Sequence, residues 1–177
     1  MIYNVAQLLK APVGTAIRLD LDPEDGLILD EEHVRLVGDV AGQVRLHRTN
    51  QGILVDGTAS APVELQCDRC LEPFTTTITF PLREQFYPTI EVNTGVPLPA
   101  TEDDLGFAID PNHTLDSREA IRQNLLVALP IRAICREDCA GLCAQCGQNL
   151  NVGTCDCVPD TSDERFAPLR ALLDGGR

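Results

Sequence analysis

The sequence predicts an α+β fold, in which an antiparallel β meander or small barrel packs with one helix and is followed by a cysteine-rich C-terminal segment. Three observations predict it: short runs of alternating polarity at close spacing, one amphipathic helix pattern, and eight cysteines, six of them within residues 135–157. A chain of 177 residues suits one domain with a small appendage. We expect a β-rich domain over residues 1–130, and a cysteine-rich segment with a short terminal helix over residues 131–177.

The first half of the chain is predicted to consist mostly of strands. Residues 4–10 show a short helix pattern that stops at Pro12 and Gly14. Thr15–Leu21 then alternates between apolar and polar side chains, as a half-buried strand does. Similar short runs separated by turn residues favour a meander, and these further predicted strands are Val34–Val40, Gln43–Arg48, Ile53–Ala59, Val63–Gln66, Thr75–Leu82 and Phe107–Ile109.

One clear helix is predicted near residues 117–129. Asp116 is its expected N-cap, with Glu119 placed for a capping box, and Pro130 ends it. Apolar residues at helical spacing predict that one face packs on the sheet, and they are Ile121, Leu125, Ala128 and Leu129. A second, shorter pattern predicts a terminal helix over Glu164–Leu173.

The chain is strongly acidic, with 27 Asp and Glu against 14 Lys and Arg, a formal net charge of −13. Nucleic-acid affinity rests largely on Lys and Arg contacts to phosphate, so this charge favours a basic protein partner over naked RNA. Arg45, His47 and Arg48 make one small basic spot, too small to reverse the charge. The other histidines, His33 and His113, are expected at the surface.

The N-terminus shows no signal-peptide pattern, and no stretch approaches the roughly 20 apolar residues of a membrane span. We therefore expect a cytoplasmic protein that makes no membrane contact. Thiols stay reduced in that compartment, so clustered cysteines there are metal ligands more often than disulfides.

The spacing of the cysteines points to zinc. Pairs two residues apart let a tight turn aim two sulfurs at one ion, and zinc binds four thiolates tetrahedrally. Gly147, directly after one such pair, can adopt the positive φ that such a turn needs. The candidate metal ligands are Cys67, Cys70, Cys135, Cys139, Cys143, Cys146, Cys155 and Cys157.

Two partitions of these eight ligands are open. In the favoured one, Cys67 and Cys70 share an ion with Cys135 and Cys139, and the remaining four cysteines form a second closed site, because structural zinc sites use four protein ligands. In the alternative, Cys139 joins the C-terminal site, and Cys67 and Cys70 are left with Cys135.

Catalytic chemistry has little support in the sequence. A redox C-x-x-C sits at a helix N-terminus, which lowers the thiol pKa, whereas Cys67 and Cys70 lie between two predicted strands. The sequence contains none of the common phosphate-binding, zinc-protease or serine-hydrolase motifs. We therefore expect a protein that is not an enzyme, and no small-molecule substrate is evident.

Two blocks of the sequence, Cys67–Phe74 and Leu129–Leu173, are distinctive in combination. Together they closely resemble the bacterial YceD-like family, while the likeness over the first 60 residues is loose. The family is named for large-subunit ribosomal RNA accumulation and has plant chloroplast relatives linked to the same RNA. The family often has Asp-Pro-Arg after the last cysteines, where this chain has Asp163-Glu164-Arg165.

The resemblance implies a role in assembly of the large ribosomal subunit or in accumulation of its RNA. It supplies no known reaction and no catalytic residues. The first interpretation is thus a zinc-stabilised, non-enzymatic assembly factor that contacts a ribosomal protein or a pre-ribosomal particle. The alternatives are a thiol redox or metal-sensing protein, and a metal-dependent RNA-processing enzyme, which would need an open coordination position.

Overall fold

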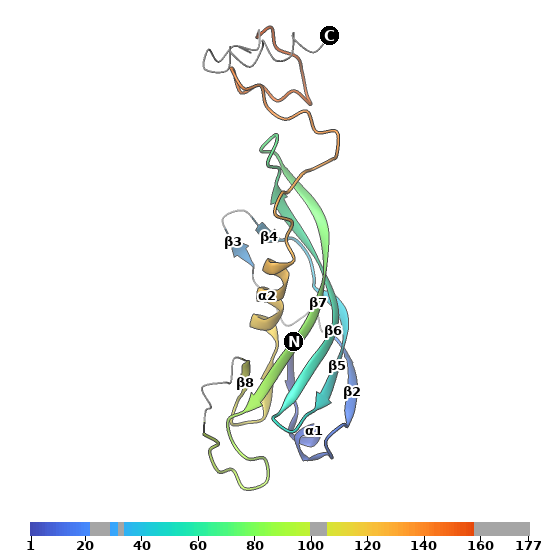
Figure 1. Ribbon diagram of the computed structural model, residues 1–177, viewed down its shortest axis with the longest axis vertical. Coiled ribbons are helices and arrows are strands. Elements are labelled where there is room, and N and C mark those ends of the chain that lie inside the picture. The colour runs from blue at the N-terminus through green and yellow to red at the C-terminus, as the bar shows by residue number, and fades with distance from the viewer. Residues whose placement is uncertain (22–28, 32–33, 100–105, 158–177) are drawn as a thin grey trace, which may run out of the picture.

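A computed structural model describes residues 1–21, 29–31, 34–99 and 106–157. These residues form two helices, a seven-stranded mixed sheet and a separate two-stranded antiparallel sheet, and a long hairpin draws the molecule out along one axis (Figure 1). The predicted terminal helix at 164–173 and His33 lie outside the described residues. The elements are β1 (Ile2–Asn4), α1 (Ala6–Lys10), β2 (Ala16–Asp20), β3 (Asp30–Glu31), β4 (Val34–Leu36), β5 (Ala41–Arg48), β6 (Ile53–Gln66), β7 (Pro73–Pro88), β8 (Phe107–Ile109), β9 (Thr114–Asp116) and α2 (Arg118–Val127).

The β6–β7 hairpin is the central element of the sheet, and the strands β4, β5 and β8 pair with it. Its two strands pair antiparallel from Ile53↔Phe86 to Gln66↔Pro73. One edge of β6 is shared by β5 and, further along, by β4. The sequence predicts two strands where the structure has the single strand β6. Pro62 lies inside this strand without breaking it. Its carbonyl accepts from Val37 N–H at 3.0 Å, so the proline nitrogen faces the same edge of β6. That edge lies in the gap between β5 and β4, where no ladder bond from this nitrogen is needed.

The sheet differs from the predicted antiparallel meander at β8. This strand pairs parallel with β7, from Phe86↔Phe107 to Pro88↔Ile109. A parallel neighbour requires a long crossover connection, and the chain between Pro88 and Phe107 supplies one. Among the described residues the strands pair in an open, branched order, so no barrel closes there.

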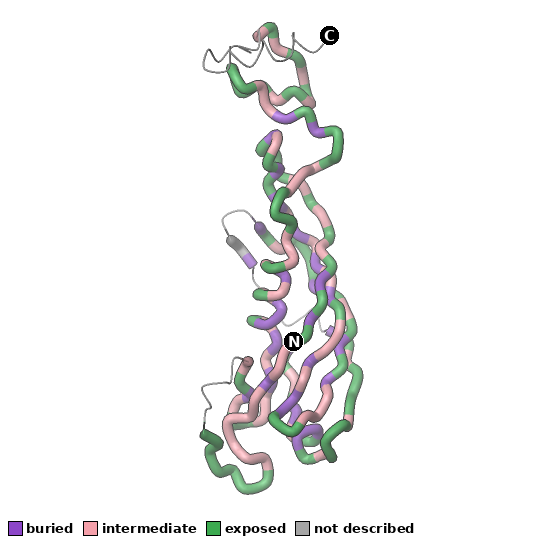
Figure 2. Tube along the Cα trace, viewed as in Figure 1, coloured by how far each residue is buried: buried purple, intermediate pink, exposed green. Residues whose placement is uncertain are grey.

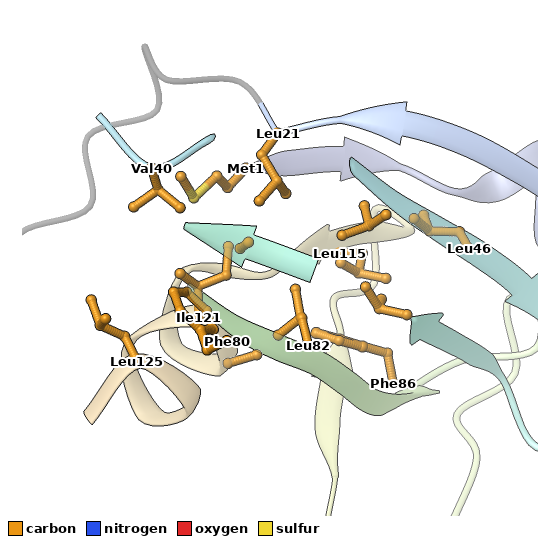
Figure 3. Packing of buried hydrophobic residues seen from close by; sticks show 14 of the residues in the cluster. Met1, Leu21, Val40, Leu46, Phe80, Leu82, Phe86, Leu115, Ile121 and Leu125 are labelled. Carbon is orange, nitrogen blue, oxygen red and sulfur yellow. The ribbon is translucent and has the colours of Figure 1, made fainter. Parts of the chain in front are cut away.

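The main core lies between the sheet and α2. Alternation along β7 turns Phe80, Leu82 and Phe86 into the same core as Ile121 and Leu125 of α2, with Phe80 beside Ile121 (Figure 3). All five side chains are buried. Ile121 and Leu125 of the predicted apolar face are thus buried in this core, and Ala128 and Leu129, which follow the last residue of α2, are partly buried against it.

The start of α2 differs from its prediction. Asp116 ends β9 and Ser117 is the N-cap residue, without a side-chain cap bond. The Ser117 hydroxyl instead donates to Met1 O at 3.0 Å, and Glu119 pairs with Arg122 at 2.8 Å. Asp116 Oδ1 accepts from Arg118 N–H at 3.0 Å, but Glu119 accepts from Arg122 and Gln123, so the predicted capping box does not form.

The cysteine-rich segment has a different character from the sheet domain. It follows α2 past the tip of the β6–β7 hairpin to one end of the molecule (Figure 1), and Figure 2 shows that end mostly exposed or half-buried. Of residues 131–157, only Cys139 and Gly141 are buried. Apolar burial therefore contributes little to its stability. No helix in the described part of the chain has the length and apolar character to cross a membrane.

Candidate metal centres

The eight cysteine sulfurs lie in two groups of four, each with all its sulfurs within 4.8 Å of one another. We call them the hairpin centre, Cys67, Cys70, Cys135 and Cys139, and the terminal centre, Cys143, Cys146, Cys155 and Cys157. These are the two sets of the favoured partition, and Cys139 does not join the terminal set.

The spacing of the sulfurs suits a tetrahedral metal ion. In the hairpin centre, the Sγ atoms of Cys67 and Cys139 are 3.9 Å apart, as are those of Cys70 and Cys135. Zinc–sulfur bonds of about 2.3 Å in a tetrahedron place the sulfurs about 3.8 Å apart, whereas a disulfide requires about 2.05 Å. The cysteines in both centres are free, and four such sulfurs could hold one metal ion.

The first C-x-x-C forms the turn of the β6–β7 hairpin, where the sequence predicts it. Cys67 N–H donates to Glu72 O at 2.9 Å, and Leu71 N–H donates to Cys67 O at 2.8 Å. Leu71 has a φ of +60°. This conformation closes the turn and leaves both cysteine side chains on its inner side, buried.

The second C-x-x-C repeats this turn position by position. Cys143 N–H donates to Gln148 O at 2.8 Å, and Gly147 N–H donates to Cys143 O at 2.9 Å. Gly147 has a φ of +74°, as its place in the sequence predicts. The two turns thus share one geometry. The position with positive φ is Leu71 in the first turn and Gly147 in the second, and glycine is the residue that adopts positive φ without strain.

We predict opposite effects of exchange at these two positions. Leu71→Gly should stabilise the metal-loaded protein by about 1 kcal/mol, because a left-handed conformation is costly for a residue with a Cβ and the leucine is largely exposed. Gly147→Ala should destabilise it by a similar amount, although a Cβ there would meet no atom within 4 Å. Denaturant unfolding measures both, and changes of the same sign would contradict the shared-turn interpretation.

The hairpin tip also binds the C-terminal segment through the residues between its cysteines. Asp68 N–H donates to Ala133 O at 2.8 Å, and its carboxylate accepts from Ala133 N–H at 2.7 Å. The Arg69 guanidinium donates to Cys139 O at 2.9 Å, and Arg69 O accepts from Leu142 N–H at 3.1 Å. Sequence reasoning missed Asp68 and Arg69, although two charged residues inside a C-x-x-C are a signal of such contacts.

Burial and hydrogen bonds make the thiols of the hairpin centre unequal. Burial would raise the pKa of Cys67, but backbone N–H groups, that of Cys135 first, lower it to about 6. Burial raises the pKa of Cys135 to about 12, with the neighbouring Cys67 sulfur adding to the effect. Four adjacent thiolates repel one another, so a cation is the natural counter-charge for this set.

The terminal centre shows the same inequality in a more open setting. Backbone N–H groups of Cys146 and Gln145 lower the pKa of Cys143 to about 6, while the adjacent Cys146 sulfur and burial raise that of Cys157 to about 12. Cys146 is exposed. This centre is therefore the more accessible of the two.

Within the described residues, no other group of histidine, cysteine or acidic side chains has ligand geometry. His47 and His113 join neither centre. The C-x-x-C at Cys67 sits in a hairpin turn rather than at a helix N-terminus, so it lacks the helix geometry that activates redox thiols.

Comparison with known protein families gives a match that covers all eight cysteines. The family model described as "Large ribosomal RNA subunit accumulation protein YceD" matches residues 55–173, a span that holds both centres. The chain belongs to the YceD family. The prediction drawn from the two sequence blocks is thereby confirmed, and no solved structure matches the chain.

Relatives of this YceD-family chain occur in bacteria and plants. An uncharacterised protein of Mycobacterium tuberculosis is 35% identical over 108 residues, which cover 60% of this chain and 49% of that protein. One of Mycobacterium leprae is 33% identical over 133 residues, 73% of this chain and 55% of that protein. The chain thus spans about half the length of these mycobacterial relatives. The large ribosomal RNA subunit accumulation protein YCED homolog 1, chloroplastic, of Arabidopsis thaliana is 37% identical over 73 residues, 41% of this chain and 22% of that protein.

Proposed function

We propose that this chain is a non-enzymatic cytoplasmic factor for assembly of the large ribosomal subunit or accumulation of its RNA, stabilised by two zinc ions and in contact with a basic ribosomal protein. The observation that carries the proposal is the presence of two four-cysteine clusters inside the region that matches the YceD family. The family name indicates large-subunit RNA accumulation.

Zinc is the metal that this donor set favours. Four thiolates in a closed set are typical of structural zinc sites, whereas catalytic zinc keeps one position for water or substrate. The eight residues of the two centres would be the ligands, four to each ion. In this role zinc supplies cross-links and no reaction, which supports a non-enzymatic function.

The charge of the chain supports a basic protein partner. The net charge is −13, and each four-thiolate zinc site would add two further negative charges, so two sites bring it to −17. A surface of this charge attracts a basic protein and speeds association, while salt weakens the attraction. Ribosomal proteins that bind RNA carry the required basic charge.

We predict that the purified zinc-loaded chain binds isolated basic large-subunit ribosomal proteins without RNA. The association rate should fall several-fold as salt rises from about 0.05 to 0.3 M, because the Debye length shortens. Surface plasmon resonance with nuclease-treated components measures this, and an acidic ribosomal protein is the control. Binding that needs intact RNA would contradict the proposed partner.

Tight binding of isolated ribosomal RNA fragments at about 0.15 M salt would also contradict it. The structure shows which residues to neutralise in that case. Arg48, part of the predicted basic spot, donates to Leu9 O at 3.0 Å and to Gly52 O at 3.2 Å, so its role is structural. The strand register places Arg18 opposite Arg45, and both side chains are exposed. Arg18 and Arg45 are therefore the residues to neutralise.

One observation favours the metal-sensing alternative. The terminal centre is partly exposed and contains Cys143, a thiol whose pKa is lowered to about 6. Such thiols react readily when no metal covers them. Elemental analysis of protein purified under reducing conditions separates the two functions, because a structural role requires zinc in both centres at isolation.

A further inference from the structure

The Asn151 side chain connects the two candidate centres. Asn151 lies in the loop between Cys146 and Cys155 of the terminal centre, yet its Nδ2 atom is 3.4 Å from Cys139 Sγ of the hairpin centre. A segment of one centre therefore supplies a hydrogen bond to a sulfur of the other.

The orientation of the Asn151 amide is determined by its neighbours. Its Oδ1 accepts from Ala140 N–H at 2.8 Å and from the Arg136 guanidinium at 2.7 Å. Both partners can only donate, so the oxygen must face them. The NH2 group then has to face Cys139 Sγ and Asn149 Oδ1, the latter at 2.9 Å, and all four hydrogen-bonding positions of the amide are used.

The loop that carries Asn151 lies between two pairs of cysteines of the terminal centre, Cys143 with Cys146 and Cys155 with Cys157. Besides the bonds of the Asn151 amide, Leu150 N–H donates to Gly141 O at 2.9 Å, and Asn151 N–H donates to Asn149 Oδ1 within the loop at 3.0 Å. Val152 is 86% exposed, so no apolar core holds the loop. An ion that joins Cys155 to Cys146 would close the loop on both sides and hold Asn151 against Cys139.

We propose that Asn151 couples the two centres, so that zinc in the terminal centre strengthens zinc binding in the hairpin centre. This rests on the zinc binding proposed above. The amide N–H stabilises negative charge on Cys139 Sγ, and hydrogen bonds to metal ligands are typically worth 10–100-fold in metal affinity. By thermodynamic reciprocity, zinc in the hairpin centre strengthens binding in the terminal centre by the same factor.

The test is a double-mutant cycle with zinc as the probe. Wild type, Asn151→Asp, Cys155→Ser/Cys157→Ser and the triple variant are equilibrated at buffered free zinc and alkylated. Mass spectrometry of the peptide containing Cys67 and Cys70 reports occupancy of the hairpin centre alone. Asn151→Asp replaces the N–H donor by oxygen and should raise the zinc concentration for half-protection about 10–100-fold. The Cys155→Ser/Cys157→Ser variant, which empties the terminal centre, should also raise this zinc concentration. If the two changes act through one coupling, the triple variant should need little more zinc than the more strongly affected of the other two variants.

Asn149→Asp is the matched control. It makes the same charge change in the same loop but keeps the oxygen that accepts from Asn151 N–H and Nδ2, so half-protection should stay near the wild-type value. Equal effects of the two Asp variants, or independent effects that multiply in the triple variant, would overturn the coupling while leaving zinc binding intact. Absence of zinc protection in the wild type would overturn the proposed zinc binding, and the coupling with it.

Discussion

Removal of metal with a chelator is expected to unfold residues 131–157 while the sheet and α2 keep their fold. The sheet domain has a continuous apolar core, but residues 131–157 bury only Cys139 and Gly141. Chain entropy costs about 1–2 kcal/mol for each ordered residue, which this segment cannot offset by burial. Zinc-finger sites supply about 10–16 kcal/mol of apparent binding free energy that is also folding free energy.

Native mass spectrometry and hydrogen exchange measure this prediction together. Protein purified under reducing conditions should contain two zinc ions per chain, and chelation should abolish amide protection in residues 131–157 but spare β6 and β7 away from the tip. Protein without metal and with the segment still protected would overturn the structural role of zinc. One ion per chain would support a role for zinc but contradict two filled centres.

Serine at Cys67 is expected to unfold more of the molecule than serine at Cys155. Cys67 is fully buried and lies in the centre that joins the hairpin tip to the segment after α2, since Cys70 and Cys135 are 65 residues apart in sequence. The loss of one ligand opens this long-range cross-link and leaves three thiols without a closed site. The connection from α2 to the hairpin then depends on the hydrogen bonds of Asp68 and Arg69.

Hydrogen exchange on residues 117–129 distinguishes the two variants. Cys67→Ser should lower protection at the C-terminal end of α2 by at least tenfold, because that end is no longer anchored at Cys135. Cys155→Ser is the matched control, with the same atom change in the terminal centre, and with zinc at a concentration that saturates the hairpin centre it should leave α2 near its wild-type protection. Equal protection of α2 in both variants would contradict a hairpin centre that bridges the two parts of the chain.

Sequence patterns predicted most of the elements, because local periodicity reflects which side chains face the core. The strand patterns led to β2, β5 and β7, and the helical pattern led to α2. The errors have tertiary causes. Pro62 lies inside β6 without breaking it, since its nitrogen faces a gap between two neighbouring strands, and β8 runs parallel to β7 because of the crossover that precedes it.

The candidate site divides in the same way. Cysteine spacing alone indicated a metal-binding segment and a closed four-ligand chemistry, since two cysteines around a tight turn are a local feature. Cysteine spacing left both partitions open, because it did not show whether Cys139 lies beside the hairpin tip or beside the four cysteines that follow it. The structure places Cys139 at the hairpin tip. The charged residues inside the C-x-x-C were a signal of contacts at Arg69, but the partners of Asn151 and Arg69 could not be assigned from sequence, because they lie on segments that only folding brings together.

The sequence by itself thus determined the kinds of chemistry open to this protein: clustered cysteines that could bind a metal ion, a strongly acidic composition, and family blocks around the cysteines. Only the tertiary structure decided how these parts combine. Residues 65 or more positions apart meet at the hairpin tip, and such contacts arise from the register of β6 and β7 and the path of the chain after α2. Local patterns favoured this pairing of the cysteines but did not decide it, because the path depends on how α2 packs on the sheet.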